Sequence, residues 1–123
     1  MKKAYDGFTF AGTLYCDMLR AAKYRHEGDT IWRVRGWFDM EKFNKEYGYP
    51  VPNTDTSGED WKLYGEAFKC LEDRGLVRKE FYSRPAGKGW VSWYWRFELV
   101  LWGDKLAIAD KYVAAMNKAK GAN

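Results

Sequence analysis

The sequence has 123 residues, a length that suits one compact domain with a core of its own. Hydrophobic residues make up 46% and charged residues 31%, and no apolar run approaches the roughly 18 residues that a membrane span needs. The first ten residues lack the apolar segment of a signal peptide, so a cytoplasmic protein with reduced thiols is expected. A net charge of +4 permits contact with nucleic acid without requiring it.

The first third of the chain predicts a helix and then a strand. Apolar residues recur at helical spacing from about Thr9 or Gly12 to Glu27, and Gly28 can end this helix because glycine tolerates a left-handed cap. In residues 30–37, which read TIWRVRGW, basic and apolar side chains alternate. This period of two is typical of a strand, so one face of the strand is expected to be basic and the other apolar.

Two further helices are predicted around a loop. Asp39 can cap a short helix that ends at Gly48, and the two prolines of residues 49–58 predict a loop after it. A third helix should begin near Gly58, with apolar residues again at helical spacing. Gly65 in its middle costs about 1 kcal/mol relative to alanine, which close packing against another helix would explain.

The rest of the chain predicts two strands joined by a turn, and then a last helix. Residues 76–83 and 90–101 are strand-like, RPAGKG between them is a turn, and Asp104 can cap the helix. One face of the second strand gathers Val91, Trp93, Trp95, Phe97 and Leu99. The other face carries Ser92, Tyr94, Arg96 and Glu98. The apolar face is expected to lie against the core, because a shift of one residue would expose all of it.

The stretch CLEDRGLVRKEF, residues 70–81, joins the third helix to the first of these strands. Leu71 and Leu76 are expected to be buried, and Gly75 to make the left-handed turn between helix and strand. This ending resembles the helix-to-wing joint of winged helix-turn-helix domains, including MarR-like and PadR-like regulators. The resemblance covers roughly residues 12–102 and concerns the fold rather than one particular protein.

The resemblance implies a single α+β domain over residues 1–123, in the order helix, strand, helix, helix, strand, wing turn, strand, helix. It also implies double-stranded DNA as a partner, as in transcriptional regulators or phage and plasmid regulators. In such domains the third helix usually enters the major groove, and the wing holds phosphates. The candidate DNA contacts are Thr56, Ser57, Lys62, Lys69, Arg78, Arg84 and Lys88.

Charge is divided between the third helix and the wing. Residues 55–74 contain six acidic and three basic side chains, whereas residues 76–90 contain four basic and one acidic. An acidic helix would lie where DNA is strongly negative, so the wing is expected to lead any contact with DNA.

The same charge pattern fits an alternative partner, a protein. A winged-helix inhibitor or adaptor, such as a phage-encoded protein that acts against its host or the host's defences, would use its acidic third helix and exposed aromatic residues. The candidate contacts in this case are Glu59, Glu66, Trp32 and Tyr94. A homodimer through the last helix and the tryptophan-rich strand is a further hypothesis. The sequence leaves DNA and protein open as partners.

Catalysis is the class of function that the sequence supports least. His26 is the single histidine, at the end of the first predicted helix, where a capping or surface role is expected. No Ser-His-Asp set, phosphate-binding loop or zinc-ligand spacing can be assembled, so no catalytic residue, metal or cofactor is expected. Cys16 and Cys70 are expected to be buried free thiols.

Overall fold

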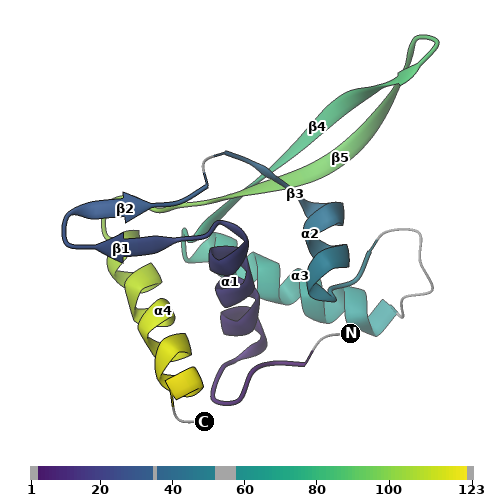
Figure 1. Ribbon diagram of the computed structural model, residues 1–123. Coiled ribbons are helices and arrows are strands. Elements are labelled where there is room, and N and C mark those ends of the chain that lie inside the picture. The colour runs from purple at the N-terminus through teal and green to yellow at the C-terminus, as the bar shows by residue number, and fades with distance from the viewer. Residues whose placement is uncertain (1–2, 35, 52–57, 122–123) are drawn as a thin grey trace.

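The computed structural model describes residues 3–34, 36–51 and 58–121, which form four helices and two antiparallel sheets in an α+β arrangement (Figure 1). The helices are α1 (Phe10–Ala21), α2 (Met40–Tyr47), α3 (Gly58–Asp73) and α4 (Lys105–Gly121). The strands are β1 (Arg25–Glu27), β2 (Thr30–Trp32), β3 (Phe38–Asp39), β4 (Val77–Gly87) and β5 (Trp90–Leu99). β1 pairs with β2, and the other sheet has the order β3–β5–β4. No helix within the described ranges is long and apolar enough to cross a membrane.

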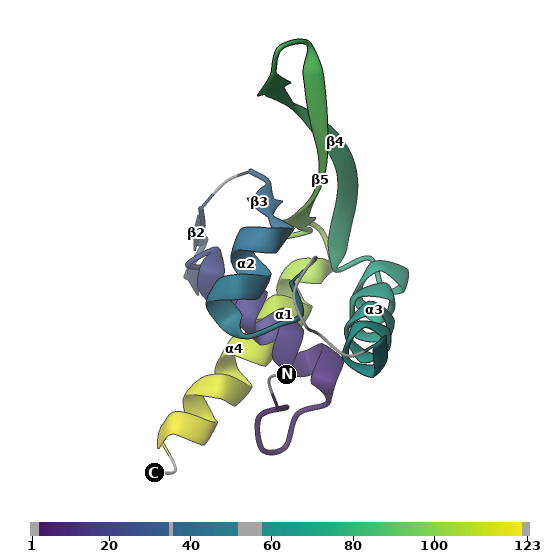
Figure 2. The ribbon, with the colours of Figure 1, turned by 90° about the vertical axis from the view of Figure 1, so that its right-hand side faces the viewer.

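The hydrophobic core lies where α1 packs against α3 and α4, at the base of the three-stranded sheet (Figure 2). α1 is buried along most of its length, and Leu14, Met18 and Leu19 are at most 1% exposed. Leu71 of α3 and Ala109 of α4 are fully buried in the same core. Each large apolar side chain removed from water in this way stabilises the fold by about 1.5–3 kcal/mol.

The first helix is shorter than predicted, because it ends at Ala21 rather than at Glu27. Lys23 occupies the left-handed region just after the helix, at φ 52°, a position that glycine usually fills. Gly28, predicted to end the helix, instead lies in the turn between β1 and β2. The predicted strand over residues 30–37 is also too long. Among the described residues of this stretch, which exclude residue 35, only those of β2 form a strand, and β2 pairs with β1 rather than with the main sheet.

The joint between α3 and β4 forms as predicted. Gly75 has φ 71°, and the backbone N–H groups of Gly75 and Leu76 donate to the carbonyl oxygens of Glu72 and Leu71, both at 2.9 Å. These two hydrogen bonds form a Schellman motif, which satisfies carbonyl groups at the end of the helix. Leu71 and Leu76 are fully buried, so the start of β4 is anchored in the core.

The predicted bounds of α2 and the predicted start of α4 agree with the structure as well. The side chain of Asp39 accepts a hydrogen bond from the backbone N–H of Lys42 at 2.9 Å, and Gly48 ends α2 at a left-handed φ of 81°. α4 begins at Lys105, directly after the predicted cap Asp104. The order of helices that the sequence predicts is therefore the order observed.

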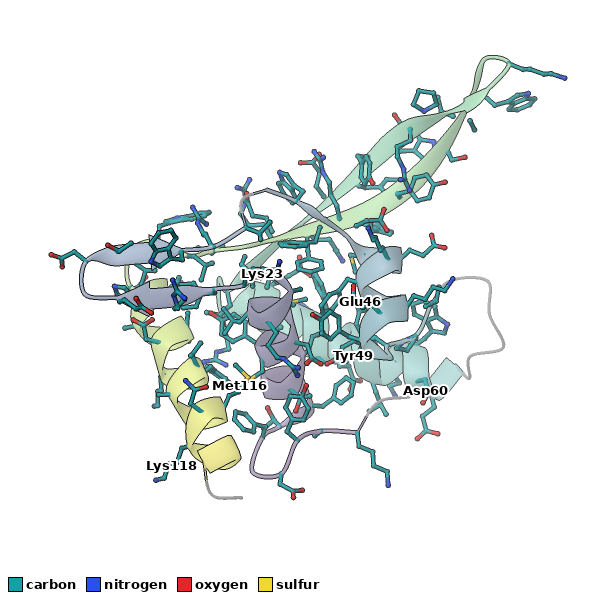
Figure 3. The ribbon with its side chains drawn as sticks, in the orientation of Figure 1. Lys23, Glu46, Tyr49, Asp60, Met116 and Lys118 are labelled. Carbon is teal, nitrogen blue, oxygen red and sulfur yellow. The ribbon has the colours of Figure 1, made fainter. Side chains whose placement is uncertain are left out.

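A buried carboxylate holds the chain on both sides of α1. Asp17 is fully buried and accepts hydrogen bonds from the hydroxyl groups of Tyr5 and Tyr49, the latter at 2.7 Å. Arg20 lies 3.7 Å from the same carboxylate. Burial, and next the hydrogen bond to Asp17, raise the pKa of Tyr49, so its hydroxyl remains a donor. Figure 3 shows Tyr49 lying among the helices, where an unpaired charge would be costly.

We predict opposite effects on stability for two glycine substitutions. A Cβ at Gly65 would meet open space, so the close packing expected there from the sequence is wrong, and Gly65→Ala should raise the free energy of unfolding by about 1 kcal/mol. Gly75→Ala should lower it by about 1 kcal/mol or more, because it adds a Cβ at φ 71° only 3.1 Å from the Cε atom of Lys105. Urea unfolding followed by circular dichroism measures both, and shifts of the same sign would contradict the assignment.

Asp110 of α4 fastens the β1–β2 hairpin to the body. The Tyr24 hydroxyl donates to one carboxylate oxygen of Asp110 at 2.5 Å, and His26 Nδ1 lies 2.7 Å from the other. His26 belongs to β1, whereas the sequence predicted it at the end of the first helix. Burial acts to raise the pKa of Asp110, but the hydrogen bonds from Tyr24 and His26 outweigh it and hold this pKa below its usual range.

The lowered pKa of Asp110 predicts a pH-dependent contribution to stability. A depressed carboxylate pKa stabilises the fold at pH values above the unfolded pKa of about 4, and this contribution disappears as the pH falls through the folded pKa. Asp110→Asn should therefore lower the free energy of unfolding at neutral pH, and its difference from wild type should shrink below about pH 4. Thermal unfolding at a series of pH values tests this, with the exposed Asp104→Asn as control. A difference that stays constant down to acid pH would count against it.

Candidate functional site

A long β-hairpin projects from the helical body (Figures 1 and 2). β4 and β5 pair with each other from Val77 and Leu99 outward, but β3 pairs with β5 only at Phe97 and Arg96. We name residues 81–95, beyond these pairs, the arm. With six or seven residues in each strand at ~3.3 Å per residue, the arm extends roughly 20 Å. β4 thus continues past its predicted end, and much of the predicted turn is strand.

One face of the arm, which we name the apolar face, carries no charged side chain. Its members, paired across the two strands, are Phe81 and Trp95, Ser83 and Trp93, and Pro85 and Val91. The exposed fractions are 48% for Phe81, 54% for Val91, 58% for Trp93 and 44% for Trp95. The Phe81 ring stacks on Trp93 with centroids 5.0 Å apart and lies 4.6 Å from Trp95. Lys79 Nζ lies 4.8 Å from the centroid of the Trp95 ring, at the base of the face. About half of each of these apolar side chains remains in solvent, so the face is an exposed apolar surface.

This exposure corrects the prediction that the whole apolar face of the second strand lies against the core. Phe97 and Leu99 are buried as expected, but Val91, Trp93 and Trp95 are about half exposed. The physical reason is the length of β5, because the strand extends farther than the helices that cover its base. Figure 3 shows side chains projecting into solvent along the arm.

On the opposite face of the hairpin, arginine side chains lie in ion pairs and over aromatic rings. Arg96 lies 2.5 Å from Glu80, and its guanidinium stacks between Tyr82 and Trp37 at 4.7 and 4.9 Å from the ring centroids. Tyr94, a predicted protein contact, is half-buried on this face. Such contacts satisfy the guanidinium charge within the chain.

Asp39 connects this face of the arm to α2. While one of its carboxylate oxygens caps α2, the other accepts hydrogen bonds from the Tyr82 hydroxyl at 3.1 Å and from Arg84 at 3.3 Å. Arg84 also lies 3.5 Å above the ring of Tyr94. The Asp39 carboxylate therefore tethers the arm to the body at residues that lie beyond the pairing of β3 with β5.

The predicted phosphate contacts of the wing fall into two groups, those paired with carboxylates of the same chain and one that is not. Arg78 pairs with Glu98 at 3.0 Å, and Arg84 pairs with Asp39. Lys88 is exposed in the turn at the tip of the arm, and no ion pair of this lysine is found among the described residues. Of the three predicted phosphate contacts in the wing, Lys88 at the tip is thus the one whose charge is not compensated by a carboxylate among the described residues.

On α3, the predicted contacts lie on an exposed face of mixed charge. Lys62 and Lys69 are exposed there together with Glu59 and Glu66, and Lys69 pairs with Asp73 at 3.3 Å. The two remaining predicted DNA contacts, Thr56 and Ser57, fall outside the described residues. The exposed face of α3 has no excess of positive charge to hold phosphates.

A groove of about 400 Å³ lies at the base of the arm, between β5 and the starts of α2 and α3. Its lining consists of Met40, Glu41, Asn44, Trp61, Tyr64, Ser92, Trp93, Tyr94 and Trp95. Tyr64 donates a hydrogen bond to Asn44 at 2.9 Å, which fixes the floor. Because Trp93 and Trp95 belong both to the groove and to the apolar face, the two form one continuous surface.

Sequence reasoning missed this surface, since it assigned its tryptophans to the core. Of the predicted protein contacts, Trp32 is half exposed in β2, at the side of the body away from the tip of the arm (Figure 1). The structure therefore does not bring Trp32 together with Tyr94 or Glu59. The available signal was the length of the paired strands, which exceeds what helices of this size can cover.

Neither cysteine forms a disulfide, but only Cys16 is buried, so the prediction of burial is wrong for the exposed Cys70. Burial, and next the nearby Asp17, raise the pKa of Cys16 to about 12, which leaves an inert thiol. Within the described part of the chain, no three His, Cys, Asp or Glu side chains are grouped closely enough to hold a metal ion.

Comparison with models of known protein families gives no match, and comparisons with curated proteins and with solved structures give none either.

We predict that the apolar face of the arm contributes little to folding. Phe81→Ser combined with Trp93→Ser should lower the free energy of unfolding by no more than about 1 kcal/mol, because both rings are already half in water. Phe97→Ala should lower it by about 3–5 kcal/mol, because it empties a fully buried site. Urea unfolding compares the variants, and a loss for the arm variant equal to that for Phe97→Ala would show that the face is packed rather than free.

Proposed function

We propose that this chain is a small protein-binding module that docks on a partner protein through the apolar face of the arm and the adjoining groove. The observation that carries the proposal is the contrast between the two faces of the arm. Phe81, Trp93 and Trp95 are about half exposed on one face, while Arg84 on the other face, and Arg78 and Arg96 at the base of the hairpin, are paired within the chain. The cores of protein interfaces are rich in aromatic residues and poor in charge, and tryptophan is prominent among their hot spots.

We further propose that the fold is a winged helix-turn-helix, with β4 and β5 as an extended wing. The strand order β3–β5–β4 and the position of α2 and α3 between β3 and β4 support this assignment. The Schellman joint at Gly75 supports it too, because it leads from the third helix directly into the wing. Since winged helices bind proteins as well as DNA, the fold alone does not decide between the two partners.

DNA binding is the second candidate, and the exposed Lys88 at the tip of the arm favours it. Its weakness lies in the other predicted contacts, because Arg78, Arg84 and Lys69 already pair with carboxylates of the same chain. Contact with phosphates would have to break these pairs or share them, which lowers the gain from counterion release. The geometry therefore supports a protein partner better than a duplex.

The experiment that tests the proposal uses two matched double variants of the hairpin. Immobilised wild type is exposed to an extract of the source cells, each captured protein is purified, and its dissociation constant is measured directly. Phe81→Ser with Trp93→Ser should raise that constant on the order of 30-fold, as loss of a hot spot does. Arg78→Ala with Arg84→Ala removes positive charge from the opposite face of the same hairpin and should leave the constant within about threefold, as for contacts outside a hot spot.

Titration with random-sequence duplex DNA at several salt concentrations is the measurement that could contradict the protein-binding proposal. Binding that weakens steeply with salt, and whose salt slope falls with Arg84→Ala and Lys88→Ala but not with the serine variant, would replace the protein-binding proposal by wing-led DNA binding.

A further inference from the structure

We propose that the protein which binds the arm is a second copy of this chain. In this two-fold dimer each apolar face packs against the other, and the tip of each arm enters the groove of the opposite subunit. The inference rests on the proposed function, because it names the partner of the same surface.

The apolar face suits pairing with itself. A two-fold interface brings one patch against its own copy, so any charged group near the axis would meet a like charge. The three cross-strand pairs of the apolar face contain no charged residue, and the charge next to them is Lys79 at the base of the face, whose Nζ atom lies 4.8 Å from the centroid of the Trp95 ring. Its middle pair is formed by Ser83 and Trp93, so an antiparallel arrangement would place the axis there, with small and large side chains alternating across it.

Face-to-face pairing would bury the exposed part of four large apolar side chains from each copy. Aromatic side chains bury about 150–250 Å² each, and Phe81, Trp93 and Trp95 are between 44% and 58% exposed. Together with Val91 they present on the order of 350 Å² of apolar surface. Two copies would cover roughly 700 Å², and contacts of the tips in the two grooves would add to this area toward the roughly 1,000 Å² at which stable interfaces begin.

Charge complementarity sets the arrangement of the two arms. The tip carries Lys88, for which no acidic partner is found among the described residues, whereas the groove at the base carries the exposed carboxylate of Glu41. Glu59 and Asp60 add negative charge at the start of α3, and Figure 3 shows Asp60 at this end of the helix. Glu41 comes two residues after Asp39, which pairs with Arg96 at the base of the arm, so the acidic end of the groove lies away from the tip. Antiparallel overlap of two arms therefore brings each tip to this end of the opposite groove.

Charge reversal at two exposed positions tests this arrangement by sedimentation equilibrium from low to high micromolar concentration. Wild type should dimerise. Lys88→Glu would place glutamate against Glu41, and Glu41→Lys would place lysine against Lys88, so each variant alone should raise the dimer dissociation constant by about tenfold or more. Circular dichroism verifies that both variants keep the fold.

The decisive sample is a mixture of these two variants. In a mixed dimer both contacts are again between opposite charges, so mixing should restore association close to that of wild type. A chain that carries both substitutions should also dimerise. Only a reciprocal contact between tip and groove predicts this recovery. Phe81→Ser with Trp93→Ser should abolish the dimer, because it removes the aromatic centre of the interface.

The inference is overturned if wild type stays monomeric throughout this range, or if it dimerises but the mixture of charge variants does not recover. A monomer that still captures another protein through the apolar face overturns the dimer and leaves the proposed function standing. A monomer that captures nothing, or only DNA, overturns both. Dimerisation that survives the serine variant would place the contact elsewhere, for example on α4, and would likewise overturn the inference.

Discussion

The packing of Phe97 at the base of the hairpin determines how the rest of the molecule is arranged. This ring is fully buried and lies 5.3 Å from Phe38 of β3, 5.0 Å from Phe43 of α2 and 6.4 Å from Phe68 of α3. It is thus the point at which the sheet and two helices meet. Residues of β5 after Phe97 belong to the core, and residues well before it belong to the arm. Because aromatic pairs prefer defined geometries, this cluster also fixes the direction in which the hairpin leaves the body.

Asp39 complements this apolar anchor on the other side of the sheet. Its carboxylate caps α2 and also accepts hydrogen bonds from Tyr82 and Arg84. A single acidic residue therefore ties the start of a helix to the base of the arm. With Phe97 on one face and Asp39 on the other, a two-stranded hairpin that would be marginal by itself is held from both sides.

The sequence predicted those parts of the fold that depend on local backbone chemistry. The caps at Asp39 and Gly48 and the Schellman joint at Gly75 each require a particular residue type, and each forms where expected. The end of α1 was missed because Lys23 takes a position that glycine normally fills.

The candidate site could not be predicted in the same way. Alternation along β5 indicates that its two faces differ, but not how far the helices reach along them. The exposure of Trp93 depends on that reach, which is a property of the packed molecule. The pairing of Arg78 and Arg84 with acidic residues distant in sequence likewise depends on the tertiary structure. Because of it, these two arginines are not free to hold phosphates, as the sequence had predicted.

The separation of the arm from the core has a consequence for how the protein can change over time. A substitution in a packed interior must satisfy many neighbours at once, so most such changes are lost. Side chains on the apolar face are about half in solvent, and the buried core lies beyond them at Phe97. New combinations of residues on this face can therefore arise without unfolding the protein. Among descendants of this chain, the arm is expected to diverge fastest wherever its binding partner changes, while the Phe97 cluster, Asp39 and the Gly75 joint stay constant.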